Sequence, residues 1–278
     1  MLGPNGAGKS TVLNCICGLL EPSSGRIRVL GHDVVSDGRA ARASLGVTPQ
    51  ELALYEDLSA RENLEYWGGA QGLRGAELRE RVREALELAS LGDRAREPVK
   101  RFSGGMKRRP NFACGVLLRP KVVLLDEPTV GVDPQSRVRL LDLVREQARD
   151  GACVLYTTHY MDEAEQLCHR LAVIDHGEIV AAGTVEELRA RSGEHDLLRL
   201  SGSFRAGDAQ RAVGLLEDSE VVQATADQLT IALRNGSQRL PLVLAAVQQE
   251  GAQVRDVKLS QPNLETLFIK LTGRELRE

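Results

Sequence analysis

The chain has 278 residues and a net charge of −3; 42% of its residues are hydrophobic and 27% are charged. This balance is typical of a globular protein, so it excludes a wholly disordered chain and allows one large domain, or a medium and a small one. Only 3% of the residues are aromatic and the charge is slightly acidic, which argues against a stacking platform for single-stranded nucleic acid and against a broadly basic surface. We therefore expect no nucleic-acid partner.

The first predicted element is a phosphate-binding loop. Residues 3–10 read Gly-Pro-Asn-Gly-Ala-Gly-Lys-Ser and match the pattern G-x-x-x-x-G-K-[ST], in which backbone N–H groups surround phosphates, the lysine reaches the terminal phosphates and the serine binds Mg²⁺. Residues 10–20 lack proline and predict a helix whose N-terminal end faces the anion. The alternative is a fortuitous glycine-rich turn, and the pattern calls for a preceding buried strand that residues 1–2 do not supply.

Helices are predicted in the middle of the chain. Ser59-Ala-Arg-Glu62 is a capping box that opens a helix toward Trp67, and residues 76–91 have apolar residues at helical spacing. Ser103-Gly104-Gly105 offers a capping serine and two glycines, which is common loop chemistry but also suits a helix N-terminus that contacts phosphate. Pro110 lies inside that helix, where the missing donor and a clash with the preceding turn predict a kink or an early end.

An apolar run at 122–125 ends in two carboxylates, Asp126 and Glu127. We interpret it as a buried parallel strand whose carboxyl end carries metal chemistry, with Asp126 placed to hold Mg²⁺ and Glu127 to polarise a water. An ordinary exposed strand end is the alternative. Further along, predicted helices and strands alternate, which favours a mostly parallel sheet covered by helices: helices 134–149 and 161–168, strands 153–157 and 171–175.

A second, smaller domain is predicted near the C-terminus. A capping box at 184–187 and the Arg-Ser-Gly at 191–193 separate domain 1–192 from domain 196–278. The second domain has the β-α-β-β-α-β order of a ferredoxin-like fold: strands 197–200, 221–225, 229–234 and 254–259, helices 209–217 and 241–250. In the last helix, one apolar face is expected to pack on its own domain, with another subunit or a membrane as the alternatives: Leu264, Leu267, Phe268 and Leu271.

Six motifs in a fixed order carry a family resemblance: the loop at 3–11, Thr-Pro-Gln50-Glu, Phe-Ser-Gly-Gly-Met at 102–106, Leu-Leu-Asp-Glu-Pro-Thr at 124–129, Gly-Val-Asp133-Pro and Thr-Thr-His159. They resemble the ATP-binding subunits of ABC transporters. The sequence around Gln50 and Asp133 is similar to that of bacterial ABC-2 type exporters of the drug and multidrug group. The resemblance implies an α/β P-loop NTPase fold with a helical lobe, followed by the small α+β ferredoxin-like domain. The Leu-Glu-x-x-Phe and Leu-Thr-Gly near the end of that domain are also similar to the C-terminal extension of ABC-2 type ATPases.

The resemblance also implies cofactors and site residues. ATP would be bound by Gly3, Asn5, Gly6, Ala7, Gly8, Lys9, Ser10, Thr11, Ser103, Gly104, Gly105 and Asp133. Mg²⁺ would be bound by Ser10, Gln50 and Asp126, and the catalytic residues would be Glu127, His159 and Gln50. Residues 103–105 would contact ATP held by the opposite subunit, so hydrolysis requires a dimer, with Asp133 at the dimer contact. His159 would hold the γ-phosphate and orient Glu127.

The implied function is that of an ATPase, either a homodimer or paired with a second ATPase subunit, which drives export through a separate ABC-2 type membrane subunit. The resemblance also implies a location at the cytoplasmic face of the membrane. No apolar run in the sequence is long enough to cross a bilayer. The groove for the membrane subunit's coupling helix would be lined by apolar residues that follow Gln50, with core packing as the alternative for each: Leu52, Leu54, Tyr55 and Leu58.

Two departures from the family pattern modify these expectations: Pro110 within the helix after Ser103, and the start of the chain inside the loop motif. The family's opening strands precede the loop, so we expect Met1 to stand inside a longer ATPase, and no adenine-stacking residue is identified. The basic run at 107–109 is expected to be a solvated face near the nucleotide. A shortened chain with poor hydrolysis is one alternative. A non-transport ATPase acting on DNA or ribosomes is another, but the coiled-coil insertion or second cassette of such proteins is missing from the sequence.

Overall fold

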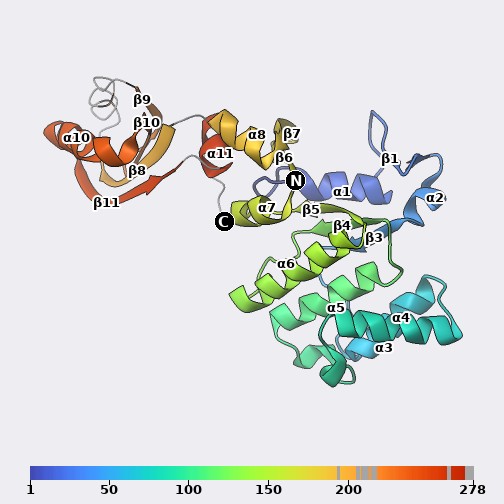
Figure 1. Cartoon of the computed structure of the whole chain (residues 1–278). Helices are drawn as coiled ribbons and strands as arrows, with labels where there is room; N and C mark the ends of the chain where they lie inside the picture. The colour runs from blue at the N-terminus through green and yellow to red at the C-terminus, as the bar shows by residue number, and fades with distance from the viewer. Residues whose placement is uncertain (193–194, 205–206, 208–212, 214–217, 262–263, 273–278) are drawn as a thin grey trace. The chain divides into compact units, whose positions relative to one another are not determined.

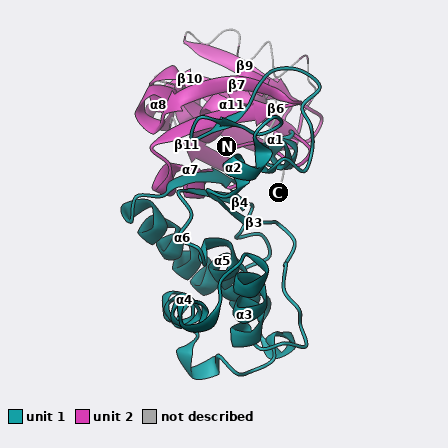
Figure 2. Cartoon of the chain, turned by 90° about the vertical axis from the view of Figure 1, so that its right-hand side faces the viewer, with its two compact units in different colours: residues 1, 8–159 teal, residues 2–7, 160–278 magenta. Residues whose placement is uncertain are grey.

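The computed structural model describes the chain except for residues 193–194, 205–206, 208–212, 214–217, 262–263 and 273–278 (Figure 1). The described residues divide into two compact units: Met1 with residues 8–159, and residues 2–7 with residues 160–278 (Figure 2). The first unit contains α1 (Lys9–Cys17), β1 (Arg28–Val29), β2 (His32–Asp33), α2 (Gly38–Arg42), β3 (Leu45–Thr48), α3 (Ala60–Ala70), α4 (Gly75–Leu88), η1 (Gly92–Arg94), η2 (Val99–Arg101), α5 (Gly104–Val116), β4 (Val122–Asp126), α6 (Pro134–Arg149) and β5 (Cys153–Thr157).

The second unit contains α7 (Met161–Leu167), β6 (Arg170–Asp175), β7 (Glu178–Thr184), α8 (Val185–Ser192), β8 (His195–Ser203), β9 (Ser219–Ala224), β10 (Gln228–Arg234), α10 (Gly236–Gln249), β11 (Gln253–Ser260) and α11 (Leu264–Thr272). Most of the predicted helix at 209–217 lies outside the described residues. The predicted domain limits, 1–192 and 196–278, stay predictions.

A parallel sheet in the order β3-β4-β5 forms the centre of the first unit. Because side chains alternate along a strand, the apolar run of β4 serves both faces. The partly buried Val122 and the buried Leu124 pack against Leu13 of α1, while Val123 and Leu125 point to the other face and are fully buried. This two-sided burial explains why β4 has no polar residue before Asp126, where the strand reaches its carboxyl end.

A helical lobe is formed by α3, α4 and α5, which lie side by side (Figure 1). Its core is aliphatic and includes Leu64, Val82 and Leu86. The predicted capping box opens α3: Ser59 Oγ accepts from Glu62 N at 3.2 Å, and Glu62 Oε2 accepts from Ser59 N at 2.7 Å. This reciprocal pair satisfies two donors that the first turn of a helix cannot satisfy itself.

Two helices of the first unit end differently from the prediction. α1 stops at Cys17 instead of Leu20, because Gly18 takes a left-handed conformation with φ of 72° and closes the helix with bonds to the carbonyls of Asn14 and Cys15. α5, in contrast, continues through Pro110 to Val116. The predicted early end at Pro110 is therefore wrong, because tertiary packing around the buried residues 110–114 overrides the local propensity of proline.

In the second unit, Leu2 adds one strand-like residue to the antiparallel pair β6-β7. Leu2 N donates to Ala172 O at 2.9 Å, Ile174 N donates to Leu2 O at 2.8 Å, and the bridge between Leu2 and Val173 is parallel. Leu2 is fully buried. Leu2 is an isolated bridge and not a strand, so the expectation that residues 1–2 supply no strand before the phosphate loop holds.

The C-terminal sheet has the antiparallel order β11-β8-β10-β9, with α10 packed against β8 and β11 (Figure 1). This strand order and the chain order together are those of a ferredoxin-like fold, as predicted. The helix α10 begins at Gly236, earlier than the predicted Pro241, because Asp196 Oδ2 accepts from Gly236 N at 2.6 Å and satisfies a first-turn donor. Pro241 is exposed within this helix, so water can reach the carbonyl that its missing N–H leaves open.

The last helix, α11, buries its apolar face, but not on the domain that the sequence predicted. Leu264, Leu267 and Phe268 pack in a cluster with residues of α7, β6, β7 and α8 and with Leu2. The expected packing on the 196–261 sheet is therefore wrong for these side chains: the pattern predicted the buried face and not the surface that covers it. None of the helices in the described ranges is long and apolar enough to cross a membrane.

Candidate active site

The phosphate loop leads directly into the first turn of α1. Gly6 has φ of 80° and Gly8 has φ of 104°, conformations that favour glycine, and Ala7 N donates to Pro4 O at 3.2 Å. Gly8 is the N-cap and has no side chain with which to cap the helix. The N–H groups of the first turn, which includes Lys9, Ser10 and Thr11, therefore form a potential anion site at the positive end of the helix. The remaining predicted ligands precede them in the loop: Gly3, Asn5, Gly6 and Ala7.

Three predicted residues meet at the start of α1 and the end of β4. Lys9 Nζ lies 2.8 Å from Glu127 Oε1, and His159 Nδ1 lies 3.1 Å from Glu127 Oε2. Their side chains are only 4%, 6% and 8% exposed, respectively for Lys9, Glu127 and His159. Buried charges are tolerated when they are paired, so each group here depends on the others. The arrangement places a cation on one oxygen of the Glu127 carboxylate and an imidazole on the other.

The neighbouring strand β5 fixes the Asp126 carboxylate and the backbone of Glu127 through Thr157. Asp126 and Thr157 are register partners on β4 and β5, and Thr157 Oγ1 donates to Asp126 Oδ1 at 2.6 Å while it accepts from Glu127 N at 3.0 Å. Glu127 has φ of 43°, an unusual left-handed conformation for a residue with a side chain. Sequence reasoning missed Thr157, because its place opposite Asp126 depends on the register of β4 and β5, which no local pattern gives.

A second group of predicted residues gathers at the start of α5. Ser103 Oγ accepts from Met106 N at 3.3 Å and caps the helix. A Cβ added to Gly105 would lie 2.6 Å from Asp133 Oδ2 and 2.5 Å from Ser136 Oγ, so only glycine fits between the two helix starts. Asp133 Oδ1 accepts from Ser136 N at 2.9 Å, and this bond lowers the pKa of the Asp133 carboxyl. Ser103, Gly104 and Asp133 are all exposed.

The third predicted element, Gln50, has an exposed side chain at the end of β3. Its backbone carbonyl accepts a hydrogen bond from Arg108 Nη1, and Arg108 Nη2 donates to Val130 O at 3.0 Å. Lys107 pairs with Glu56, and Arg109 donates to two backbone carbonyls at 3.1 and 3.2 Å. The prediction of a solvated basic face at 107–109 is therefore wrong. Burial lowers the pKa of the Arg108 and Arg109 guanidinium groups.

A groove of about 1090 Å³ lies between α2, β3, α3 and α5. Trp67 Nε1 donates to Ala53 O at 2.9 Å, and Asn111 Oδ1 accepts from Ala53 N at 2.8 Å, so the segment after Gln50 is anchored along this groove. Asn111 Nδ2 is buried without a partner. Of the four predicted lining residues, Leu54 packs against the lobe core, and none lines the groove; basic side chains do: Arg39, Arg42, Arg119 and Lys121.

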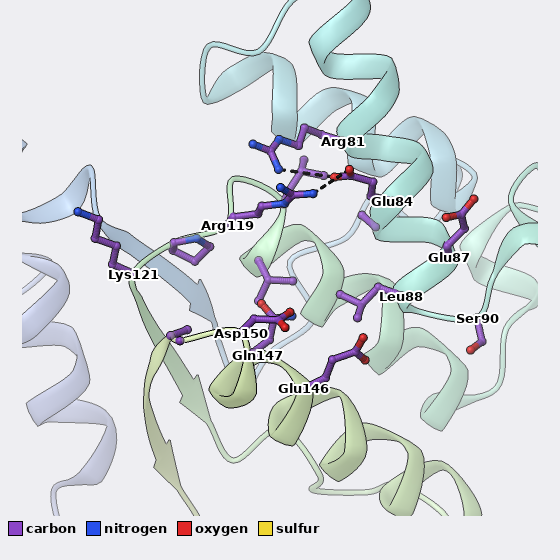
Figure 3. A pocket seen from close by; sticks show the side chains of 16 residues that line it. Arg81, Glu84, Glu87, Leu88, Ser90, Arg119, Lys121, Glu146, Gln147 and Asp150 are labelled. Carbon is purple, nitrogen blue, oxygen red and sulfur yellow. Dashed lines mark hydrogen bonds and ion pairs between the residues drawn. The ribbon is translucent and has the colours of Figure 1, made fainter.

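Another cavity, of about 700 Å³, lies between α4, the end of α5 and the end of α6 (Figure 3). Its walls carry charges of both signs, and Glu84 pairs with Arg119 at 2.8 Å and with Arg81 at 3.5 Å across one side. None of its lining residues in the described part of the chain belongs to the predicted site. The groups around Lys9 and Ser103 therefore remain the candidate active site.

Comparisons with known proteins agree with this geometry. Residues 1–130 match the ABC transporter family, and residues 183–272 match the C-terminal domain of DrrA1-3-like ATP-binding proteins. The linearmycin resistance ATP-binding protein LnrL of Bacillus subtilis (strain 168) is 40% identical over 281 residues, covering 100% of this chain and 90% of that protein. The chain belongs to the ABC transporter ATP-binding proteins.

Two further similarities extend this assignment. The daunorubicin resistance ATP-binding protein DrrA3 of Streptomyces coeruleorubidus is 40% identical over 279 residues, covering 100% of this chain and 87% of that protein. A dimeric ATP-binding cassette solved in a post-hydrolysis state with ADP and phosphate is 27% identical, with a TM-score of 0.59 over 66% of this chain and 83% of that one. The predicted family, fold class and activity are confirmed: this ABC transporter subunit is an ATP-binding ATPase of the exporter group.

Proposed function

We propose that this ABC transporter ATPase binds ATP with Mg²⁺ between two copies of the chain, or with a second ATPase subunit, and drives export through an ABC-2 type membrane subunit. The observation that carries the proposal is the buried contact of Lys9, Glu127 and His159. The relatives named for resistance to linearmycin and daunorubicin support export of drug-like compounds. The chain would act from the cytoplasmic face of the membrane, bound to its membrane partner.

The nucleotide-binding role falls to the loop and the start of α1. Residues 3–8 and the first-turn N–H groups of α1 would cradle the phosphates, and Lys9 would contact the terminal ones. Phosphate oxygens would compete with Glu127 for the Lys9 ammonium, because the two are only 2.8 Å apart. Nucleotide binding would thereby release Glu127 Oε1 from its ion pair while His159 still holds Oε2.

The residues present also fit a magnesium ion. Ser10, Gln50 and Asp126 supply a hydroxyl, an amide and a carboxylate, which are the hard oxygen donors that Mg²⁺ prefers. Thr157 fixes Asp126 through Oδ1 at 2.6 Å, so that carboxylate is already oriented. When bound, the ion would neutralise charge that develops on the phosphate oxygens.

The hydrolytic role falls to Glu127 with His159. A released Glu127 Oε1 would accept a hydrogen bond from a water molecule and orient it toward the terminal phosphorus. His159, which contacts the other carboxylate oxygen at 3.1 Å, would hold the carboxylate in the required rotamer. The Gln50 side chain would sense the terminal phosphate and report its presence to the membrane subunit.

A dimer completes this chemistry. The exposed Ser103 and Gly104 at the start of α5 suit a phosphate delivered from outside the chain, and Asp133 lies directly against Gly105. We propose that this surface faces ATP bound by the second subunit.

The groove between α2, β3, α3 and α5 suits the coupling segment of the membrane partner. It combines apolar walls with the unpartnered Asn111 Nδ2, a buried donor that an incoming acceptor would satisfy. Its basic residues favour a partner segment that carries acidic side chains.

The test is Glu127→Gln in the full chain. We expect ATP binding and ATP-driven dimerisation to persist, and hydrolysis to fall by about 10²-fold or more, the usual contribution of a positioned base. Glu84→Gln, in the other cavity, is the matched control that alters a paired carboxylate away from the site. An unchanged ATPase rate in Glu127→Gln would overturn the assignment.

A further inference from the structure

One side chain of the first unit joins two segments that are far apart in sequence. Arg108 donates from Nη1 to the carbonyl of Gln50 and from Nη2 to the carbonyl of Val130, which lie 58 and 22 residues away. Arg108 follows Gly104 by one helical turn, so it lies on the face of α5 that packs against the loop leading to Asp133. A planar guanidinium is suited to hold two acceptors at a fixed spacing.

The contact with Val130 reaches the catalytic carboxylate through the backbone. Val130 N donates to Glu127 O at 3.2 Å, and Val132 N donates to Thr129 O at 3.3 Å, so the loop 127–133 is a succession of tight turns. It starts at Glu127 with φ of 43° and ends at Asp133, the N-cap of α6. An unusual backbone conformation persists only where surrounding contacts hold it. Arg108 supplies one such contact to the loop from outside it.

The contact with Gln50 belongs to a wider attachment of the segment after β3. Lys107 pairs with Glu56, Asn111 Oδ1 accepts from Ala53 N, and Arg108 holds the first residue of the segment. All three of these side chains come from α5. Of these three side chains, in the described part of the chain, Arg108 also donates a hydrogen bond to the loop 127–133.

From this geometry, and resting on the proposed function, we propose that Arg108 is a positioning residue for ATP hydrolysis. By holding the carbonyls of Gln50 and Val130 together, it fixes the Gln50 segment relative to the loop that carries Glu127. The consequence is that the amide at 50 and the carboxylate at 127 reach the same terminal phosphate together. Both bonds are charge-assisted, which makes them stronger than neutral ones, and the bond to Val130 is also partly shielded from water.

Arg109 provides a matched control one residue along the same helix. It also donates to two backbone carbonyls, those of Ala89 and Ser90, and burial lowers its pKa as it does for Arg108. Its acceptors lie at the end of α4 and not at the candidate active site. Replacing Arg109 therefore tests the loss of a contact within the lobe, and replacing Arg108 tests the loss of positioning at the candidate active site.

The experiment compares Arg108→Met, Arg108→Lys and Arg109→Met in the full chain. We measure kcat and KM for ATP hydrolysis, ATP affinity, and hydrogen exchange of peptides covering 45–58 and 127–136. We expect Arg108→Met to lower kcat about 10-fold or more at nearly constant ATP affinity, since small displacements of reacting groups have effects of this order. Exchange should rise in both peptides, and Arg108→Lys should restore part of kcat.

Arg109→Met is expected to leave kcat within about two-fold and exchange in the two peptides unchanged, because its bonds end elsewhere. The proposal is overturned if Arg108→Met lowers kcat no more than Arg109→Met does, or if its exchange increase is missing from either peptide. Failure of the proposed function looks different: the unmodified chain would bind or hydrolyse no ATP. The exchange comparison would still decide whether Arg108 holds the two segments together.

Discussion

Two glycine-rich helix starts, those of α1 and α5, carry the candidate site, and they are satisfied in opposite ways. At α1 the charged side chain of Lys9 is buried and paired with Glu127 within the chain. At α5 the N-cap Ser103 takes up the N–H of Met106, while Ser103 and Gly104 face solvent. The side-chain cation at the first start is paired within the chain, whereas the second start is exposed to solvent.

The difference bears on what each helix start needs from outside. At α1 a ligand must replace an existing ion pair, so binding there is an exchange of partners. At α5 a capped helix leaves the N–H groups of Gly104 and Gly105 for other acceptors, and nothing has to be displaced. An anion that lay between the α1 start of one copy and the α5 start of another copy would explain this difference. The α1 start would bind the anion, and the α5 start of the second copy would contact it.

The largest expected effect follows from Lys9→Met. The variant should lose ATP binding and hydrolysis, because the cation proposed to contact the phosphates is removed. It should also lower the free energy of unfolding by about 3 kcal/mol or more, since Glu127 is left buried without its cation. Denaturant unfolding and equilibrium ATP binding measure the two effects.

Lys100→Met is the control for this variant. Lys100 also forms a 2.8 Å ion pair, with Asp57, but the two side chains are 55% and 88% exposed. Solvent screens an exposed pair, so unfolding and ATP binding should change little. Equal losses of stability in the two lysine variants would contradict the view that the α1 group is a buried, interdependent pair.

Much of the site was predictable because its signals are local. The spacing of Lys9 in its loop, and the two carboxylates at the end of an apolar run, required only short stretches of sequence. The parallel sheet followed from the alternation of helices and strands, and the register then brought Thr157 opposite Asp126. That hydrogen bond was beyond the sequence, because strand register depends on pairing between segments far apart in the chain.

Long-range contacts account for the expectations that failed. Arg108 belongs to a run of basic residues that looks like a solvated face, but its partners are backbone carbonyls, which no side-chain pattern encodes. The apolar stripe of α11 identified the buried side chains, such as Leu267 and Phe268, and could not identify the cluster around Leu2 that covers them. Helix propensity likewise failed at Pro110, where packing determines the result.

A smaller effect, on the α5 side of the comparison, is expected from Gly105→Ala. The new Cβ would lie 2.6 Å from Asp133 Oδ2 and 2.5 Å from Ser136 Oγ, so α5 and α6 must separate at their starts. We expect a stability loss of about 1–3 kcal/mol, the usual range for overpacking, together with lost hydrolysis. Thermal unfolding and the ATPase rate measure these.

Gly104→Ala separates packing from phosphate contact. A Cβ at Gly104 would have its nearest neighbour, Gly131 O, at 3.7 Å, which is an ordinary contact. The melting temperature should therefore stay close to that of the unmodified chain even if hydrolysis falls. A melting temperature lowered as far as in Gly105→Ala would show that the α5 start is sensitive to any side chain, and not to the close approach of Asp133.

The smallest effect is expected from Pro110→Leu, which tests how firmly α5 is aimed. Leucine restores an N–H that can bond to the carbonyl of Met106, but the site is buried, so overpacking offsets part of the gain. We expect the free energy of unfolding to rise by about 1 kcal/mol, measured by urea unfolding, with ATPase activity unchanged or raised. Pro241→Leu, at the exposed proline of α10, lacks the packing term and should gain more. No gain in stability or ATPase rate for Pro110→Leu would mean that proline is the residue that fits best at this position of α5. The packing of Pro110, and not the hydrogen bond that proline lacks, would then set the direction of the helix.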